Sequence, residues 1–271
     1  MSFLRLIFCL LLSLPIQAET HLTGPLIQGG LMIGTTMPGA TVWQDDQPVR
    51  VSREGTFLIG FDRDMPTISQ LKIRYLDGLT EHRTLSIEQR QYAIQRIRLP
   101  HHKVAPMTPQ AVRRVRRDRH LLTQARRRDD DRQDFSTGFV WPVTGPISGV
   151  YGSQRILNGQ KKRPHYGVDV ARPTGTPIVA PAAGIVTVAE PDMFYSGGTL
   201  VIDHGHQLTS ALLHLSELSV QVGDRVHQGQ LVGRVGATGR ATGPHLDWRM
   251  KLRQYQIDPQ LLVPPMSGVM Q

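Results

Sequence analysis

The sequence predicts an all-β protein with a small N-terminal β-sandwich, a short basic helical linker and a C-terminal antiparallel β-sheet domain. Its 271 residues include 26 glycines and 19 prolines, so turns are numerous, and short apolar runs stand between these turn signals. Hydrophobic residues make up 39% of the chain, enough for one large core or two modest ones, while aromatic residues make up only 6%. This pattern favours strands over a helical bundle.

The first 18 residues are typical of a secretory signal peptide. Arg5 supplies the positive charge, Leu6 to Leu14 form an apolar run, and Ile16-Gln17-Ala18 ends in a small residue at the expected cleavage position. The run is shorter than the roughly 20 residues that a membrane-spanning helix needs. The single cysteine, Cys9, lies inside it, so we expect a mature protein without disulfides. The predicted location is periplasmic or secreted.

Residues 19–99 predict a small β-sandwich that is Ig-like in general shape. The expected strands are Ala40–Trp43, Val49–Val51, Thr56–Ile59 and Leu71–Tyr75. Asp77-Gly78, between two such runs, indicates a hairpin. The region shows no grouping of catalytic residue types, so we interpret it as an accessory domain.

Residues 100–134 predict a basic helical linker. Between residues 110 and 132, nine arginines face four aspartates, and the resulting +5 (nine minus four) is more than half of the chain's +9. Apolar residues could form one ragged helical stripe, namely Val112, Val115, Leu121, Leu122 and Ala125. We interpret the segment first as a solvated linker helix. A basic arm can bind nucleic acid, but an exported protein meets little of it, so anionic polymers or lipid surfaces are the preferred partners.

Residues 135–271 predict an antiparallel sheet curled around a groove. Glycine-punctuated strands follow one another without a long helical period, for example at Gly184–Ala189, Thr199–His204 and Leu231–Gly236. Two motifs in this domain carry the chemistry of interest. They are His165-x-x-x-Asp169 and His245-x-Asp247, and the separate His214 lies between them in the sequence.

The spacing of the two motifs can be tested against backbone geometry. In a straight strand His165 and Asp169 would lie roughly 13 Å apart, and Pro164 and Gly167 argue against a helix, which leaves a loop that curls at Gly167 and runs into a strand. His245 and Asp247 would share one face of a strand at about 6–7 Å. Imidazole nitrogen and carboxylate oxygen are zinc ligands, so the motifs predict a zinc site on the groove floor. Taken singly, each motif is equally compatible with a surface His-Asp pair that binds no metal.

Three segments in this order resemble the lysostaphin/LytM-type zinc metallopeptidases, which cleave peptide bonds in bacterial peptidoglycan. The segments are RPHYGVDVARPTGTPIVAPAAGIV, ALLHLSEL and VGDRVHQGQLVGRVGATGRATGPHLDWRM, within about Phe139 to Gln260. The resemblance implies that His165 and Asp169 are zinc ligands and that His214 is a catalytic histidine. It also implies that His245 orients or deprotonates the attacking water. It places His204 and His206 away from the metal, and we interpret them as structural.

The chain departs from the family at Asp247, where the common His-x-His motif has its last ligand histidine. Aspartate can ligate zinc, so Asp247 is the predicted third ligand. Its side chain is shorter than that of histidine, and two carboxylates would cancel the charge of the ion and weaken its Lewis acidity.

The resemblance implies an exported zinc metalloendopeptidase that hydrolyses peptide cross-links in peptidoglycan, with stem peptides as its substrate. The N-terminal domain would then be a spacer or wall-facing module, and the basic linker would contact the anionic wall or membrane surface; no nucleic-acid partner is expected. The alternative is a catalytically inactive protein of the same fold that binds the wall or activates a separate amidase, and Asp247 is the one residue that favours it.

Overall fold

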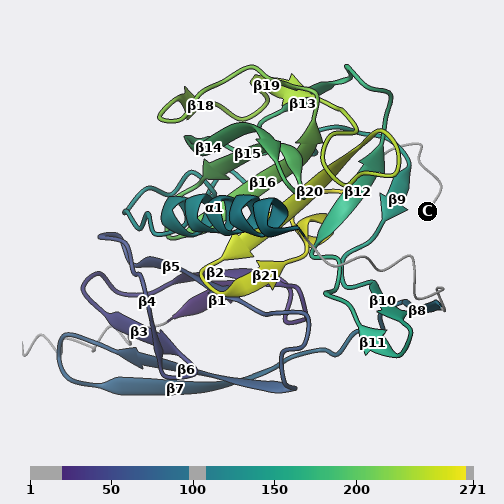
Figure 1. Ribbon diagram of the computed structural model, residues 1–271. Helices are drawn as coiled ribbons and strands as arrows, with labels where there is room; N and C mark the ends of the chain where they lie inside the picture. The colour runs from purple at the N-terminus through teal and green to yellow at the C-terminus, as the bar shows by residue number, and fades with distance from the viewer. Residues whose placement is uncertain (1–19, 98–107, 267–271) are drawn as a thin grey trace, which may run out of the picture.

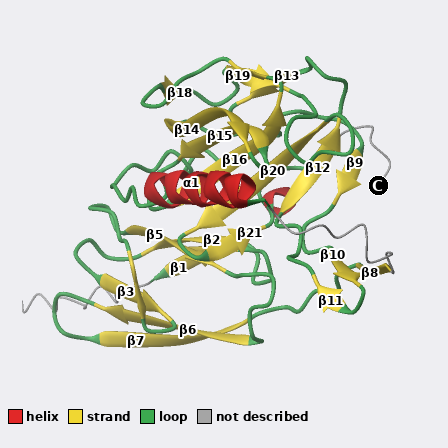
Figure 2. Ribbon diagram, in the orientation of Figure 1, coloured by secondary structure: helices red, strands yellow, loops and turns green. Residues whose placement is uncertain are grey.

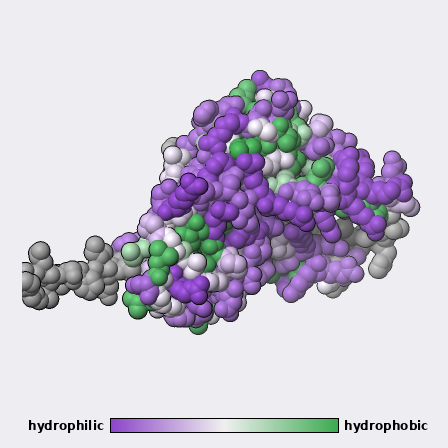
Figure 3. Space-filling view, turned by 90° about the vertical axis from the view of Figure 1, so that its left-hand side faces the viewer, coloured by the Kyte–Doolittle hydropathy of each residue, from purple (hydrophilic) through white to green (hydrophobic). Residues whose placement is uncertain are grey.

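The computed structural model describes residues 20–97 and 108–266, which form a mostly β structure with one long helix (Figures 1 and 2). The predicted signal peptide, residues 1–18, and part of the predicted linker lie outside the described residues. No helix in the described ranges is long and apolar enough to cross a membrane. The face of the molecule in Figure 3 is largely hydrophilic, with apolar atoms gathered in small patches.

The N-terminal region contains two small antiparallel sheets, as the turn-punctuated strand pattern predicts. One has the order β1 (His21–Thr23), β2 (Leu31–Thr35), β5 (Thr56–Gly60), and the other β4 (Gln47–Val49), β3 (Thr41–Gln44), β6 (Ile68–Arg74), β7 (Thr80–Ser86). The predicted hairpin is confirmed at Asp77-Gly78, where Gly78 has a φ of 89° that a glycine adopts without strain. The Ig-like shape stays a prediction.

A third small sheet joins the two halves of the chain. β8 (Ile94–Ile97) leaves the N-terminal region and pairs in parallel with β10 (Gln154–Leu157), which forms a hairpin with β11 (Gln160–Lys161). Contact between the halves therefore begins before the boundary predicted at residue 99.

The C-terminal half is built on an eight-stranded antiparallel sheet, as the sequence predicts. Its strand order is β18 (Arg225–Val226), β14 (Gly184–Met193), β15 (Gly197–Asp203), β16 (Leu208–Leu215), β20 (His245–Leu252), β12 (Gly167–Ala171), β9 (Ile147–Gly149), with β21 (Tyr255–Ile257) pairing with β20. A smaller sheet has the order β13 (Pro177–Val179), β19 (Leu231–Arg234), β17 (Glu217–Leu218), and η2 (Pro259–Leu261) is a 3₁₀ turn.

The two faces of the large sheet differ in what covers them. Leu212, Leu246 and Trp248 belong to the main core, which continues into the N-terminal sheets. Their neighbours on the same strands, Leu213 and Asp247, are paired with each other across β16 and β20 and so lie on the opposite face. That opposite face carries the candidate site.

The helix α1 (Pro109–Ala125) lies against this opposite face (Figure 1). Thr108 caps its first turn by accepting a hydrogen bond from the backbone of Ala111 at 3.2 Å, and Pro109 occupies the first helical turn. Three of the five residues of the predicted apolar stripe, Leu121, Leu122 and Ala125, pack on an apolar cluster of the sheet. The members of that cluster are Val188, Met193, Val201, Ala211 and Leu213.

The linker is helical, as predicted, but one face of the helix packs on the sheet and is not solvated. Besides its apolar contacts, α1 is held by Asp118, which is only 7% exposed and accepts a 2.7 Å hydrogen bond from the backbone N–H of Phe194. Arg114 also pairs with Asp192 at 2.8 Å. The reason is that the apolar stripe of the helix and the apolar face of β14–β16 would both contact water if the helix were solvated. Packing them together removes both surfaces from water, which is favourable.

Polar contacts hold the N-terminal region against the C-terminal half. Arg63 Nε donates to the carbonyl of Gly152 at 2.7 Å, and Arg90 Nη1 lies 2.7 Å from Oδ2 of the buried Asp258. A Cβ on Gly60 of β5 would lie 3.0 Å from the side chain of Ile257, so the strands approach closely there. The two halves thus share one continuous packed structure.

Candidate metal and catalytic site

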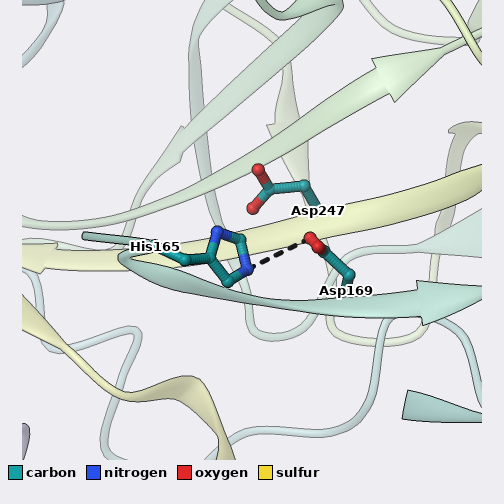
Figure 4. Close-up of side chains that lie close together, drawn as sticks. All are labelled: His165, Asp169 and Asp247. Carbon is teal, nitrogen blue, oxygen red and sulfur yellow. Dashed lines mark ion pairs between the residues drawn. The ribbon is translucent and has the colours of Figure 1, made fainter. Parts of the chain in front are cut away.

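His165 and Asp169 meet because the chain turns into β12 at Gly167. Before the strand, His165 exchanges backbone hydrogen bonds with Ser153 and Gly152, each at 2.8 Å. At Gly167 a Cβ would lie 2.5 Å from the carbonyl oxygen of Trp248, so only glycine allows this approach. His165 Nε2 consequently lies 3.2 Å from Oδ1 of Asp169 (Figure 4), as the curled loop predicts.

Asp247 joins them from the neighbouring strand. The antiparallel register of β12 and β20 places Asp247 directly opposite Asp169, so both carboxylates are on one face. One ligand atom from each of His165, Asp169 and Asp247 lies within 4.8 Å of the others. Figure 4 shows the three side chains converging on one point. The structure therefore brings together the three predicted ligands.

These three residues fit a metal ion. His165 Nε2 and Asp169 Oδ1 are buried and have no hydrogen-bond partner among the described residues. Buried polar atoms are normally satisfied, so two such atoms side by side indicate a missing partner between them. One imidazole and two carboxylates are an N/O donor set suited to a divalent metal, and the cluster is the one group of this kind in the part of the chain that the structure describes.

Asp247 also has a partner that the sequence interpretation missed. Arg249 Nε donates to Asp247 Oδ1 at 3.0 Å, and Arg249 Nη2 donates to Oδ2 at 2.6 Å. Burial alone would raise the pKa of Asp247, but the charge and hydrogen bonds of Arg249 lower this pKa below its ordinary value. The signal was present in the sequence, because residues i and i+2 of a strand share a face and carry opposite charges here.

The two predicted catalytic histidines lie side by side next to the cluster. The ring centroids of His214 and His245 are 4.8 Å apart, and His245 Nε2 lies 3.9 Å from Asp169 Oδ1. Nδ1 of His214 is 2.8 Å from the carbonyl oxygen of Thr238, and Nδ1 of His245 is 2.8 Å from that of Gly243. A carbonyl only accepts, so each Nδ1 carries a hydrogen, which leaves Nε2 as the nitrogen of each ring that can exchange a proton.

An irregularity in the sheet aims His214 at the site. The register between β15 and β16 shifts between Gly198 and Leu200, and His214 itself has a φ of 67°, which is uncommon for a residue other than glycine. Backbone strain of this kind gathers at functional sites. Burial lowers the pKa of His214, so the ring is neutral near pH 7.

The other His-x-His pair lies outside the site, as predicted. His204 is fully buried, with Nδ1 2.7 Å from the carbonyl oxygen of Ala183 and Nε2 2.7 Å from Ser210 Oγ. Burial lowers its pKa to about 4. His206 is 2% exposed and packs edge-on against Phe135 at 5.2 Å. Both are structural histidines of the β15–β16 turn.

Comparison with known proteins agrees with this geometry. The family profile described as peptidase family M23 matches residues 163–259, which include all five predicted site residues. A crystal structure of a peptidase M23 protein from Pseudomonas aeruginosa is 30% identical, with a TM-score of 0.67, over 87% of this chain and 93% of that one. The chain belongs to peptidase family M23.

Curated relatives match over shorter stretches. The peptidoglycan DD-endopeptidase ShyA of Vibrio cholerae is 38% identical over 123 residues, 45% of this chain and 28% of that protein. An uncharacterized metalloprotease of Buchnera aphidicola is 34% identical over 103 residues, 38% of this chain and 27% of that protein. The chain thus spans less than a third of the length of these relatives.

Proposed function

We propose that this protein is an exported zinc metalloendopeptidase that hydrolyses peptide cross-links of peptidoglycan. The observation that carries the proposal is the pair of buried atoms without a hydrogen-bond partner, His165 Nε2 and Asp169 Oδ1, which face each other at 3.2 Å beside the rings of His214 and His245. ShyA is named a peptidoglycan DD-endopeptidase, which supports the substrate class.

His165, Asp169 and Asp247 would hold the ion. Bound zinc supplies a Lewis acid that polarises the scissile carbonyl and makes water a better nucleophile at neutral pH. The chain's own residues supply proton transfer and orientation.

His245 is the proposed general base. Its Nδ1 hydrogen is held by the Gly243 carbonyl, so Nε2 is free to take the proton of the attacking water. Asp169 Oδ1, 3.9 Å away, would stabilise the resulting imidazolium.

His214 is the proposed partner for the leaving group. In the tautomer set by Thr238 its Nε2 carries no hydrogen, so His214 can donate to the oxyanion or to the leaving amine only after it receives a proton, and the proton released by the attacking water to His245 is the one that the leaving amine finally takes. Its ring lies 4.8 Å from the ring of His245, so both histidines would reach the same scissile peptide bond.

Residues outside the site have proposed roles in location and wall contact. Residues 1–18 would direct export to the periplasm or the medium, and residues 19–99 would serve as a spacer or wall-facing module. The exposed arginines of α1, Arg113, Arg116 and Arg119, would contact the anionic wall or membrane surface.

Purified peptidoglycan tests the proposal. The mature protein should contain close to one zinc per chain and should release cross-link fragments that mass spectrometry identifies as peptide-bond hydrolysis products. Chelation should stop the reaction and added zinc should restore it. A protein that carries zinc but leaves the cross-links intact would refute the proposed activity.

A second candidate is a non-catalytic protein that binds the wall or activates a separate amidase. The observation that favours it is that Arg249 donates hydrogen bonds to both Asp247 oxygens. Arg249 therefore competes with a metal for this ligand. Such a protein would bind peptidoglycan without zinc and without cleaving it, so the same digestion distinguishes the two functions.

A further inference from the structure

Asp247 and Arg249 form a compact ion pair on the edge of the metal cluster. Asp247 is only 2% exposed, and the arginine fork engages both of its oxygens, at 3.0 Å and 2.6 Å. Bidentate pairs of this kind fix orientation as well as charge. The carboxylate is therefore positioned and neutralised within β20 itself.

The neighbouring strand leaves room for this pair. Gly167 of β12 stands opposite Arg249, and a Cβ there would lie 2.6 Å from Arg249 Cγ and 2.7 Å from Asp247 Oδ1. Any other residue at position 167 would push the pair apart. The same glycine that allows the turn after His165 also gives the pair its space.

The formal charge of the site shows what Arg249 does. A neutral histidine and two carboxylates sum to −2, and Arg249 brings this sum to −1. A site with one carboxylate and two neutral histidines also sums to −1. An aspartate that is paired with an arginine thus carries the same net charge as one neutral imidazole, and a carboxylate with two engaged oxygens still has lone pairs for a metal.

We propose that Asp247 and Arg249 act as one unit in place of a neutral zinc-ligating histidine. Asp247 supplies the ligand oxygen, and Arg249 is a positioning residue that orients this oxygen and cancels its charge. The inference rests on the proposed zinc-dependent function. It follows that histidine at position 247 alone does not make a good site, because Arg249 would then be left without its counter-ion beside the metal.

Four proteins test the unit: wild type, Asp247→His, Arg249→Gln and the double variant. Zinc dissociation constants are measured by competition with a chromogenic chelator, and melting temperatures are measured on the metal-free proteins. Asp247→His should weaken zinc binding at least about tenfold, since an unpaired arginine repels the ion. Arg249→Gln should bind zinc about tenfold more tightly and melt at a lower temperature without metal.

The decisive result is the double variant. Its zinc dissociation constant should return to within about threefold of wild type, and its metal-free melting temperature should lie above those of both single variants, because each single variant leaves one buried charge unpaired and the double variant leaves none. Lys251→Gln is the matched control: it removes one cation from the same face of β20, two residues further on, without touching Asp247. Its effect on zinc affinity should stay below about threefold.

Several outcomes would overturn the inference. Equal zinc affinities of Asp247→His and the double variant refute the unit, because Arg249 would then be a bystander. So does simple addition of the two single losses in metal-free melting temperature, or zinc binding by the double variant when wild type binds none. If Asp247→His does not fold, Arg249→Lys replaces it: it should keep wild-type zinc affinity, and behaviour like Arg249→Gln would refute the role of charge. Coupled zinc binding without peptidoglycan cleavage would refute the proposed activity while leaving the unit intact.

Discussion

One face of the eight-stranded sheet contains two regions of opposite character. At β12 and β20 it carries Asp169 and Asp247, which meet His165 from the loop before β12, whereas on β14–β16 it carries Val188, Val201 and Ala211 under α1. The register makes both regions part of one surface, since Leu213 stands directly opposite Asp247. The difference teaches that the side chains of the sheet divide this face, because the apolar part binds α1 while the polar part gathers metal-ligand types.

The border between the two regions is electrostatic as well as steric. Arg126, which follows α1, has its pKa lowered to about 10, mainly by burial and further by the charges of Arg249 and Arg163. The end of the helix thus brings a second arginine into the range of the Asp247–Arg249 pair. Three experiments probe the two regions, and a fourth probes the buried His204 outside them.

The largest effect is expected at the metal end. His165→Ala and Asp169→Ala should each remove bound zinc and abolish peptidoglycan hydrolysis, because two protein ligands seldom hold a catalytic zinc. Both side chains are partly exposed, so the folded structure should survive, as circular dichroism can check. Stoichiometric zinc in either variant would contradict the ligand assignment.

His214→Ala should keep the metal and lose turnover by about 10²–10⁴-fold, the usual contribution of a general acid–base group. Zinc content and digestion rate are measured on the same preparation. His206→Ala serves as control, since this histidine is buried but lies outside the site. Equal activity of the His214 and wild-type proteins would make His214 structural.

His204 should make the stability of the protein depend on pH. Its folded-state pKa is about 4, below the ordinary 6.5, so the unfolded chain binds the proton first as pH falls. The contribution of His204 to the free energy of unfolding is fully present above about pH 6.5. It is lost as the pH falls towards 4, at about 1.4 kcal/mol per pH unit. The free energy of unfolding, measured with urea between about pH 4 and 6.5, should change less steeply with pH in His204→Gln than in wild type. Equal dependence on pH in the two proteins would contradict the prediction.

The smallest effect is expected under α1. Leu122→Ala should lower the free energy of unfolding by about 1–2 kcal/mol, less than a fully buried leucine costs, because Leu122 is only partly buried. Val112→Ala, on the same helix but outside the cluster, should change it by less than about 0.5 kcal/mol. Equal losses would show that the helix is not held by the apolar cluster.

Much of the fold could be predicted from local signals. Turn residues marked the strands, Asp77-Gly78 marked a hairpin, and the absence of a long helical period indicated the antiparallel sheet. The meeting of His165 with Asp169 followed from Pro164 and Gly167, because few backbone paths bring residues four apart together without a helix. The catalytic and metal roles of the site residues remain predictions.

The sequence by itself determined which segments are strands, where they turn and which side chains share a face, because these properties depend on neighbours within a few residues. Only the tertiary structure decided that β8 pairs with β10, that α1 covers β14–β16, and that a shift in register aims His214 at His245. Each of these depends on which distant surfaces gain most from mutual burial. That gain is a property of whole surfaces, so no short pattern of residues encodes it.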